Sequence, residues 1–335
     1  IPVLCISGQV ARAAIGTDAF QECDALGISR PVTKWNVQVR HAGEVADVTR
    51  RALQVAAEGR PGPVLLDLPK DVQKEEVPAH AAASSKARTA VAAASLPPPK
   101  RIREAVALMR EARRPVLYGG GGLINAGERA CELFTDLAQR LHSPCTLTLM
   151  GLGAFPASHP KYLGMLGMHG TLEANLAMHH SDLVVCVGAR FDDRVTARLQ
   201  DFCPGAKVIH LDIDPASINK VVKADLPFTG HATGLLQALG DALPVEDAEA
   251  AQRTRDWWQR IEGWRAQRSL AFEPREDVIL PQQLMRSIAS QIEGADAIVA
   301  TDVGQHQMWA AQHLKFERER RRGSSGGGGT QGEGL

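Results

Sequence analysis

Short apolar runs, each leading into a turn and a helical pattern, recur along the chain. The runs stand at residues 3–6, 63–68, 115–118, 182–187, 207–211 and 297–300. Helical spacing of apolar residues is found at 18–26 (with Asp18 as a possible N-cap), 44–58, 102–111, 127–140 and 280–292, and a further helix is expected after 302–304. A strand that returns through a helix lies parallel to the strand before it. The alternation therefore predicts an α/β fold with doubly wound parallel sheets.

Two stretches interrupt this alternation and divide the chain into domains. Residues 75–99 are rich in alanine, serine and charge and end in three prolines, which predicts an interdomain linker. Residues 246–275 are polar and rich in tryptophan, which predicts a helical linker. Because 335 residues are too many for one ordinary domain and the chain opens inside a predicted buried strand, we expect incomplete domains at 1–74 and 276–335 around a complete one at 100–245.

The composition indicates no strongly charged partner. The 38 basic residues balance the 38 acidic ones, so neither nucleic acid nor a membrane surface is an expected partner. The six cysteines are scattered and form no CxxC pair, which argues against a disulfide framework or a zinc site and favours a reducing cytoplasm. The apolar runs are too short to span a bilayer. The sequence also holds no Walker loop, Ser-His-Asp set or metal-ligand cluster.

Two features point to a nucleotide-like ligand at the carboxyl edge of the predicted central sheet. Four glycines at 119–122 follow the strand at 115–118, and glycine at a strand-to-helix turn lets the backbone approach a phosphate. Asp212 and Asp214 follow the strand at 207–211, where a carboxylate can accept ribose hydroxyls. The alternatives are a plain tight turn at 119–122 and a helix that begins at Pro215 with Asp214 as its cap.

Three further polar segments follow predicted strands. Arginines alternate with aspartates in 188–194, which suits fixed recognition of an anion, although a surface ion-pair network is the alternative. Glycines flank Met168 and His169 in 166–170, and a single histidine is more often structural than catalytic. Backbone N–H groups and a histidine at 302–306 suit a diphosphate, unless this is simply the start of a helix. These patterns indicate several anion sites but name no reaction.

Taken together, the motifs resemble the catalytic subunit of acetolactate synthase, also called acetohydroxyacid synthase, over residues 1 to about 316. The resemblance is carried by Ser7–Val10, Ile15–Glu22, Gly59–Val64, Leu166–Gly170, Gly188–Thr196 and Thr301–Trp309, in the family's order. It implies a pyrimidine-binding domain, an FAD-binding central domain and a pyrophosphate-binding domain. It also implies that pyruvate is decarboxylated on thiamine diphosphate and condensed with pyruvate or 2-oxobutyrate, the first common step of branched-chain amino-acid biosynthesis.

The resemblance assigns roles to individual residues. Those that would line FAD are Arg60, Gly119, Gly120, Gly121, Gly122, Thr148, Leu149, Met150, Met168, His169, Gly170, Gly188, Arg190, Asp192, Arg194 and Val195, with Asp212 and Ile213 near its adenosine. Those that would face the substrate channel are Phe20, Gln21 and Lys34. Met168 and Arg194 would shape the acceptor pocket, and Arg194 would hold the carboxylate of the 2-oxo acid. Those that would contact the diphosphate of thiamine diphosphate are Val303, Gly304, Gln305 and His306.

The resemblance also implies parts that this sequence does not carry. The family's activating glutamate would precede residue 1, and its Mg²⁺ ligands would follow residue 335, so we expect the 335-residue chain to lack carboligase activity. After Phe316 the sequence departs from the family's apolar pattern, with Gln331 in place of a methionine, and Ala11 and His231 replace a common proline and aspartate. The family implies a homodimer or homotetramer, in many cases with a small regulatory subunit. A sister carboligase, such as glyoxylate carboligase, and a non-catalytic FAD-binding fragment are the alternatives.

Overall fold

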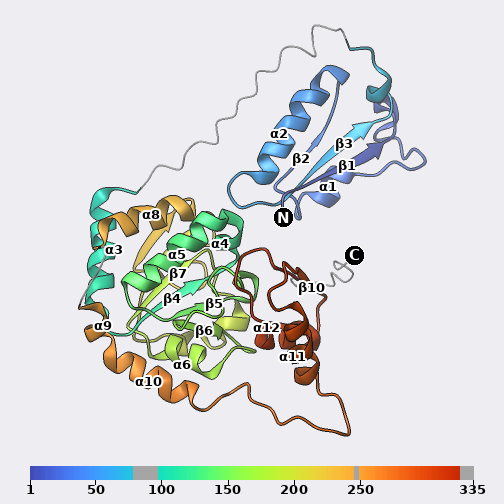
Figure 1. Cartoon of the computed structure of the whole chain (residues 1–335). Coiled ribbons are helices and arrows are strands. Elements are labelled where there is room, and N and C mark those ends of the chain that lie inside the picture. The colour runs from blue at the N-terminus through green and yellow to red at the C-terminus, as the bar shows by residue number, and fades with distance from the viewer. Residues whose placement is uncertain (78–96, 245–248, 325–335) are drawn as a thin grey trace. The chain divides into compact units, whose positions relative to one another are not determined.

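The computed structural model describes residues 1–77, 97–244 and 249–324. The chain divides into two compact units, Ile1–Ala93 and Ala94–Leu335 (Figure 1). Most of the predicted linker at 75–99, the start of the predicted helical linker at 246–248 and the tail with Gln331 lie outside the described residues. The predicted division into three domains stays a prediction, and each unit is described by itself.

The first unit is a three-stranded parallel sheet of β1 (Val3–Gln9), β2 (Trp35–Gln38) and β3 (Pro63–Pro69), in the order β1-β3-β2. Helix α2 (Val45–Ala57) packs on it through Ala52 and Ala56, which contact Val64 and Leu66 of the central strand. Short helical turns η1 (Arg12–Ala14), η2 (Ala42–Glu44) and η3 (Val72–Lys74) follow the strands. Each strand therefore ends in a turn at the carboxyl edge of the sheet.

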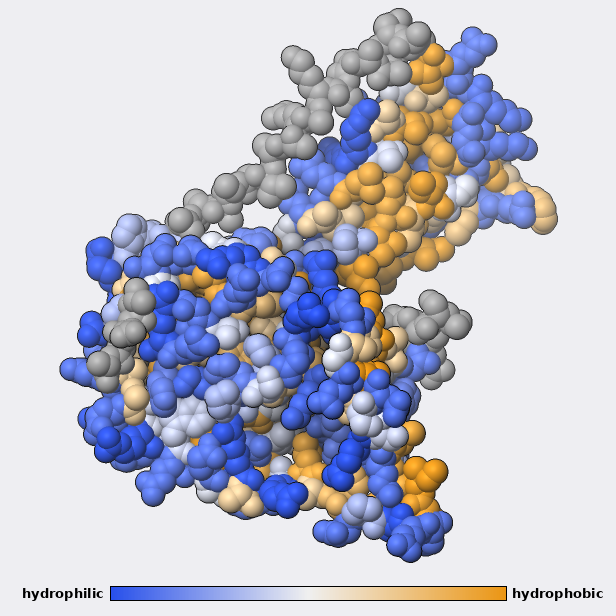
Figure 2. All heavy atoms as spheres, viewed as in Figure 1, coloured by the Kyte–Doolittle hydropathy of each residue, from blue (hydrophilic) through white to orange (hydrophobic). Residues whose placement is uncertain are grey.

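Two expectations for the first unit are wrong. The strand at 3–6 is not buried, since Val3 and Ile6 are 42% and 64% exposed. It forms a sheet edge where only Leu4 packs against the core, and apolar side chains gather on the visible surface of this unit (Figure 2). The helix expected at 18–26 is instead α1 (Ala25–Ser29), capped by Asp24. Asp18 lies in the left-handed region (φ +56°), which breaks a helix there.

The second unit contains a six-stranded parallel sheet, which confirms the predicted α/β class. Its strands are β4 (Pro115–Gly119), β5 (Cys145–Leu147), β6 (Tyr162–Met165), β7 (Leu183–Val187), β8 (Lys207–Asp212) and β9 (Leu226–Thr229). Their order in the sheet is β6-β5-β4-β7-β8-β9. The helices around it are α3 (Pro99–Glu111), α4 (Gly121–Ala126), α5 (Glu128–Arg140), α6 (Leu172–His180), α7 (Asp193–Thr196), α8 (Ala232–Ala242), α9 (Ala250–Arg253) and α10 (Arg255–Arg265).

Helices cover both faces of this sheet, as the continuous apolar runs of its strands predict. Alternate residues of one strand point to opposite faces, so Leu117 packs with α3, α5 and α8 while Val116 and Tyr118 pack with α6 and α10 (Figure 1). The tryptophan-rich stretch contributes to this second face. Trp257 of α10 is 1% exposed, and its indole N–H donates to the Pro115 carbonyl at 3.1 Å.

The last elements of the chain belong to the same compact unit. Helix α11 (Pro281–Ile292) and helix α12 (Gln305–His313) contribute Met285 and Ala310 to the core cluster that α5 and α8 share. Strands β10 (Val299–Thr301) and β11 (Arg322–Ser324) form a separate parallel pair. The strand expected at 297–300 therefore begins later than predicted. Among the described residues, no helix combines the length and apolarity needed to cross a bilayer.

Arg322 of β11 is a cation placed largely in the interior. Its Nη1 donates to the Leu149 carbonyl at 3.0 Å, but Nε and Nη2 are buried and find no hydrogen-bond partner among the described residues. Burial lowers its pKa to about 10. Because an unsatisfied buried charge is costly, we expect Arg322→Leu to stabilise the chain by about 1 kcal/mol or more in urea unfolding. The exposed Arg318→Leu variant should shift stability by less than about 0.5 kcal/mol. A less stable Arg322→Leu variant would contradict this account.

Several histidines of the second unit make its stability depend on pH. Burial is the first cause that lowers the pKa of each, and the histidines concerned are His142, His159, His180, His210 and His313. A histidine whose folded pKa lies below the unfolded value of about 6.5 stabilises the fold above that pH, and this contribution is lost as the pH falls. We expect the urea midpoint to drop between pH 7.5 and pH 5.5. An unchanged or rising midpoint would show that these rings are not held neutral.

Candidate functional site

The order of the six-stranded sheet reverses at one place, between β4 and β7. From β4 the chain adds β5 and β6 on one side, and from β7 it adds β8 and β9 on the other. In open α/β sheets the ligand crevice lies at the carboxyl ends of the strands at such a reversal. The loops that follow β4 and β7 are the glycine run Gly119–Gly122 and the segment Gly188–Arg194. The structure thus places two of the predicted ligand segments at the point where a ligand is expected.

These two loops are in direct backbone contact. The N–H groups of Gly120 and Gly122 donate to the carbonyls of Val187 and Gly188, both at 2.9 Å. A Cβ added at Gly122 would lie 2.5 Å from Gly188 Cα. The glycines are therefore needed to let the two loops come into contact. The short helix α4, which was not predicted, starts directly after Gly120. Contact of this run with a phosphate stays a prediction.

The segment after β7 alternates between buried and outward residues. Phe191 is 1% exposed and lies in the left-handed region (φ +54°), while Arg190 and Arg194 are exposed. Asp192 caps α7 by accepting the Arg194 N–H at 3.0 Å and pairs with Arg190. Burial alone would raise the pKa of Asp192, but these contacts lower it. The ion-pair alternative thus holds for Arg190, whereas no ion pair of Arg194 is found in the described ranges.

The glycine-flanked segment 166–170 lies against the end of this loop. The Met168 N–H donates to the Arg194 carbonyl at 2.9 Å, and a Cβ at Gly167 would lie 2.6 Å from the same oxygen. The Asn175 side chain holds both the N–H and the carbonyl of Gly167. Met168 itself is 64% exposed. The structure thereby brings together Met168 and Arg194, the two residues expected to shape the acceptor pocket.

The loops after β5 and β8 complete this edge. The Thr148 N–H donates to the Gly119 carbonyl at 2.9 Å, and the Thr148 hydroxyl is buried without a partner in the described part of the chain. A Cβ at Gly121 would lie 3.3 Å from Met150 Cβ. At the end of β8, Asp212 accepts the Asp214 N–H at 2.8 Å. The alternative that Asp214 caps a helix is wrong, because the residues after Pro215 form turns.

The residues expected to contact thiamine diphosphate lie at the start of α12. Gly304 precedes the helix with φ +153°, and a Cβ there would lie 3.0 Å from the His306 ring. The other end of α12 reaches the 166–170 segment, because the Gln312 amide donates to the His169 carbonyl at 2.9 Å. The structure therefore connects Val303–His306 to the acceptor-pocket segment through one helix, and their cofactor contact stays a prediction.

In the first unit the expected substrate-channel residues have different surroundings. Phe20 is 90% exposed, and Gln21 lies beside it in the left-handed region (φ +68°). The Lys34 ammonium instead donates to the carbonyls of Val55 and Glu58 at the end of α2. Lys34 therefore caps a helix in this structure. Arg60 lies three residues after the end of α2, and its FAD contact stays a prediction.

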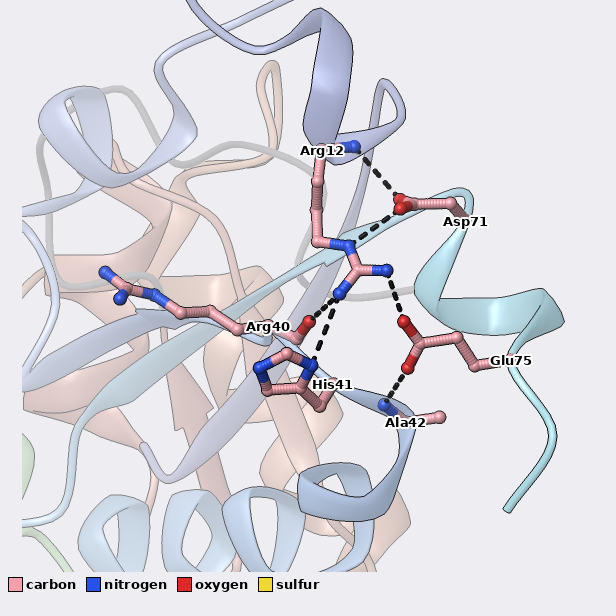
Figure 3. Close-up of polar contacts among 6 residues, drawn as sticks. All are labelled: Arg12, Arg40, His41, Ala42, Asp71 and Glu75. Atoms are coloured by element: carbon pink, nitrogen blue, oxygen red, sulfur yellow. Dashed lines mark hydrogen bonds and ion pairs between the residues drawn. The ribbon is translucent and has the colours of Figure 1, made fainter.

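Arg12, which the sequence did not single out, joins the loops that follow all three strands of the first unit (Figure 3). Its Nε donates to Asp71 at 2.7 Å, and its Nη atoms donate to Glu75 and the Arg40 carbonyl. Glu75 also accepts the Ala42 N–H at 2.8 Å. The hydrogen bond to Asp71 is the first cause that raises the pKa of Arg12, and the Arg12 contacts lower the pKa of Asp71. An arginine in an alanine-rich turn gives no sequence signal for this role.

A second polar cluster of the first unit is centred on Asp67. Asp67 of β3 is 1% exposed and accepts hydrogen bonds from Gln9 and Gln38 at 3.3 and 2.7 Å. The Gln9 amide also donates to the Cys23 carbonyl at 2.6 Å. The loop that carries Phe20 and Gln21 is thus fixed near both its ends, at Arg12 and at Cys23.

The family model described as thiamine pyrophosphate enzyme, central domain, matches residues 102–239. The chain is 44% identical over 338 residues to the acetolactate synthase isozyme 3 large subunit of Escherichia coli (strain K12), covering all of this chain and 58% of that protein. It is 44% identical to the acetolactate synthase large subunit of Haemophilus influenzae, with the same coverage. It is also 44% identical to the acetolactate synthase of Mycobacterium bovis, of which it covers 53%.

The chain spans about 58% of the length of the first two relatives. Within that span the matched central domain contains the β4–β7 reversal and the loops that meet there. The chain is therefore homologous along its whole length to the large subunit of acetolactate synthase, and in its central part to the central domain of thiamine pyrophosphate enzymes.

Proposed function

We propose that the whole protein is an acetolactate synthase, which decarboxylates pyruvate and condenses the remaining two-carbon unit with pyruvate or 2-oxobutyrate in branched-chain amino-acid biosynthesis. The observation that carries the proposal is the hydrogen bond that holds Met168 beside Arg194 at the carboxyl edge of the central sheet. Arg194 is exposed and has no ion-pair partner in the described ranges, so its guanidinium is available to the carboxylate of a 2-oxo acid. The exposed Met168 side chain would supply an apolar surface to the same pocket.

The residues at the β4–β7 reversal fit FAD. Glycines there bring three loops within backbone contact, the Thr148 hydroxyl is buried without a partner in the described residues, and Asp212 supplies a carboxylate at a strand end. In this proposal Arg190 and Asp192 orient the dinucleotide, and the 119–122 and 148–150 loops exclude water from it. FAD would be held as a structural group with no net redox role.

Thiamine diphosphate, when bound, supplies the electron sink for the decarboxylation. Residues 303–306 would hold its diphosphate through backbone N–H groups at the start of α12, and Mg²⁺ would supply the positive charge that neutralises that diphosphate. Phe20 and Gln21 would face the substrate, held by the loop that Arg12 and Gln9 fix. The proposal includes a cytoplasmic location, a homodimer or homotetramer and a small regulatory subunit.

An assay of the full gene product tests this proposal. With pyruvate, thiamine diphosphate, Mg²⁺ and FAD, we expect acetolactate, and Arg194→Leu should raise the KM for the 2-oxo acid. A matched Arg198→Leu variant, at an exposed arginine just beyond α7 that pairs with Asp201, should behave as the unmodified protein. Tartronate semialdehyde from glyoxylate without acetolactate from pyruvate would identify a sister carboligase instead. FAD binding with no condensation product would indicate a non-catalytic FAD-binding protein.

A further inference from the structure

A fully buried histidine lies beneath the loop that follows β7. His210 is 0% exposed and stands in β8, opposite Cys186 of β7 in the parallel register. Its Nε2 lies 2.9 Å from the Ala189 carbonyl. A carbonyl can only accept, so Nε2 carries the proton and donates. The Cys186 thiol points to the same carbonyl at 3.4 Å.

The same imidazole also supports the next buried residue of the loop. Its ring packs nearly perpendicular to Phe191, with centroids 5.1 Å apart, and Phe191 in turn packs on Tyr118 and Phe202. Phe191 lies at φ +54°, a conformation that residues other than glycine adopt only when their surroundings hold it. His210 thus contacts both inward anchors of the loop, the Ala189 carbonyl and the Phe191 ring.

These two anchors determine which residues of the loop face outward. Because Ala189 and Phe191 point into the core, Arg190, Asp192 and Arg194 are presented at the carboxyl edge of the sheet. His210 also lies 3.9 Å from Asp212, the carboxylate at the end of its own strand. One buried side chain therefore contacts the anchors of the 188–194 loop and lies near the carboxylate at the end of β8.

We propose that His210 is a positioning residue, whose Nε2–H hydrogen bond to Ala189 sets the conformation of the 188–194 loop and thereby the affinity for FAD. The inference rests on the proposed FAD site. The Nδ1 atom finds no partner among the described residues. A purely packing role does not explain this histidine, because an apolar side chain would fill the same space without burying an unsatisfied nitrogen. The hydrogen bond from Nε2 to the Ala189 carbonyl is what the imidazole adds over an apolar side chain at this position.

Two nearly isosteric variants of the 335-residue chain test this role. Gln in His210→Gln places an amide N–H near the position of Nε2, whereas Met in His210→Met fills a similar volume without a donor. Both variants lose the ring, so a packing role predicts equal losses for the two. We expect His210→Gln to bind FAD within about threefold of the unmodified chain and His210→Met to bind about tenfold or more weakly, because the buried Ala189 carbonyl then keeps only the weak Cys186 thiol donor. FAD titration by flavin fluorescence measures both, with thermal unfolding of the FAD-free chains as the control for folding.

Amide hydrogen exchange without FAD separates this inference from the proposed site. We expect exchange in 188–194 to rise in His210→Met and not in His210→Gln, with α5 as the internal reference. If this pattern appears but no chain binds FAD, the FAD site fails and the positioning role survives. Equal exchange and equal FAD affinity in the two variants would overturn the positioning role while leaving the FAD site intact.

Discussion

Replacing Gly122 by alanine is expected to destabilise the second unit by about 3 kcal/mol or more and to abolish FAD binding. The added Cβ would lie 2.5 Å from Gly188 Cα and 3.0 Å from the Gly188 carbonyl oxygen, and both atoms belong to backbone that cannot rotate away. The hydrogen bond from the Gly122 N–H to Gly188 would be lost with the displacement. Urea unfolding measures the loss, and flavin absorbance after gel filtration measures retained FAD.

Gly263→Ala is the matched control for this substitution. Gly263 lies within α10, and nothing stands within 4 Å of a Cβ placed there. Alanine is favoured over glycine in a helix interior, so this variant should be more stable by about 0.5–1 kcal/mol. Equal stability of the Gly122→Ala and Gly263→Ala chains would refute the close approach of the two loops.

Trp257→Ala is expected to cost about 3–5 kcal/mol of unfolding free energy, the range found for removing a buried aromatic side chain. Trp257 is among the largest fully buried side chains and packs against the sheet face that Val116 and Tyr118 line. Its loss would also leave the Pro115 carbonyl, at the start of β4, without the indole N–H that it accepts.

The exposed Gln259 of the same helix provides the control, because Gln259→Ala removes no buried contact and keeps a good helix former. Urea midpoints of the two variants should differ clearly, with Gln259→Ala within about 0.5 kcal/mol of the unmodified chain. A Trp257→Ala chain as stable as the Gln259→Ala chain would mean that α10 does not belong to this core.

The sequence predicted the elements that combine strong apolar patterns with clear boundaries. The runs at 115–118, 182–187 and 207–211 became β4, β7 and β8, because parallel strands buried on both faces read as continuous apolar stretches. The stretch at 18–26 failed because its helical spacing was weak and Asp18 and Gln21 adopt left-handed conformations that local patterns do not reveal. The role of Trp257 was missed for a related reason, since a tryptophan in a polar stretch does not name the strand against which it packs.

The loops that follow the strands of the candidate site could be predicted from the sequence, but the buried residues that hold those loops in place could not. Glycines and charged residues after apolar runs indicated the 119–122 and 188–194 loops. The contact between these two loops depends on the reversal of strand order between β4 and β7, and strand order cannot be derived from a single sequence. Arg12 and His210 act through partners far along the chain, such as Asp71 and Ala189, so no local spacing could identify them.

Titration of the purified 335-residue chain with FAD tests most directly whether the carboxyl edge at the β4–β7 reversal holds this cofactor. We expect saturable quenching of flavin fluorescence with one FAD per chain, retention of flavin absorbance through gel filtration, and loss of both in the Gly122→Ala chain but not in the Gly263→Ala chain. A folded chain that shows no saturable binding, or binding that Gly122→Ala leaves unchanged, would contradict this expectation.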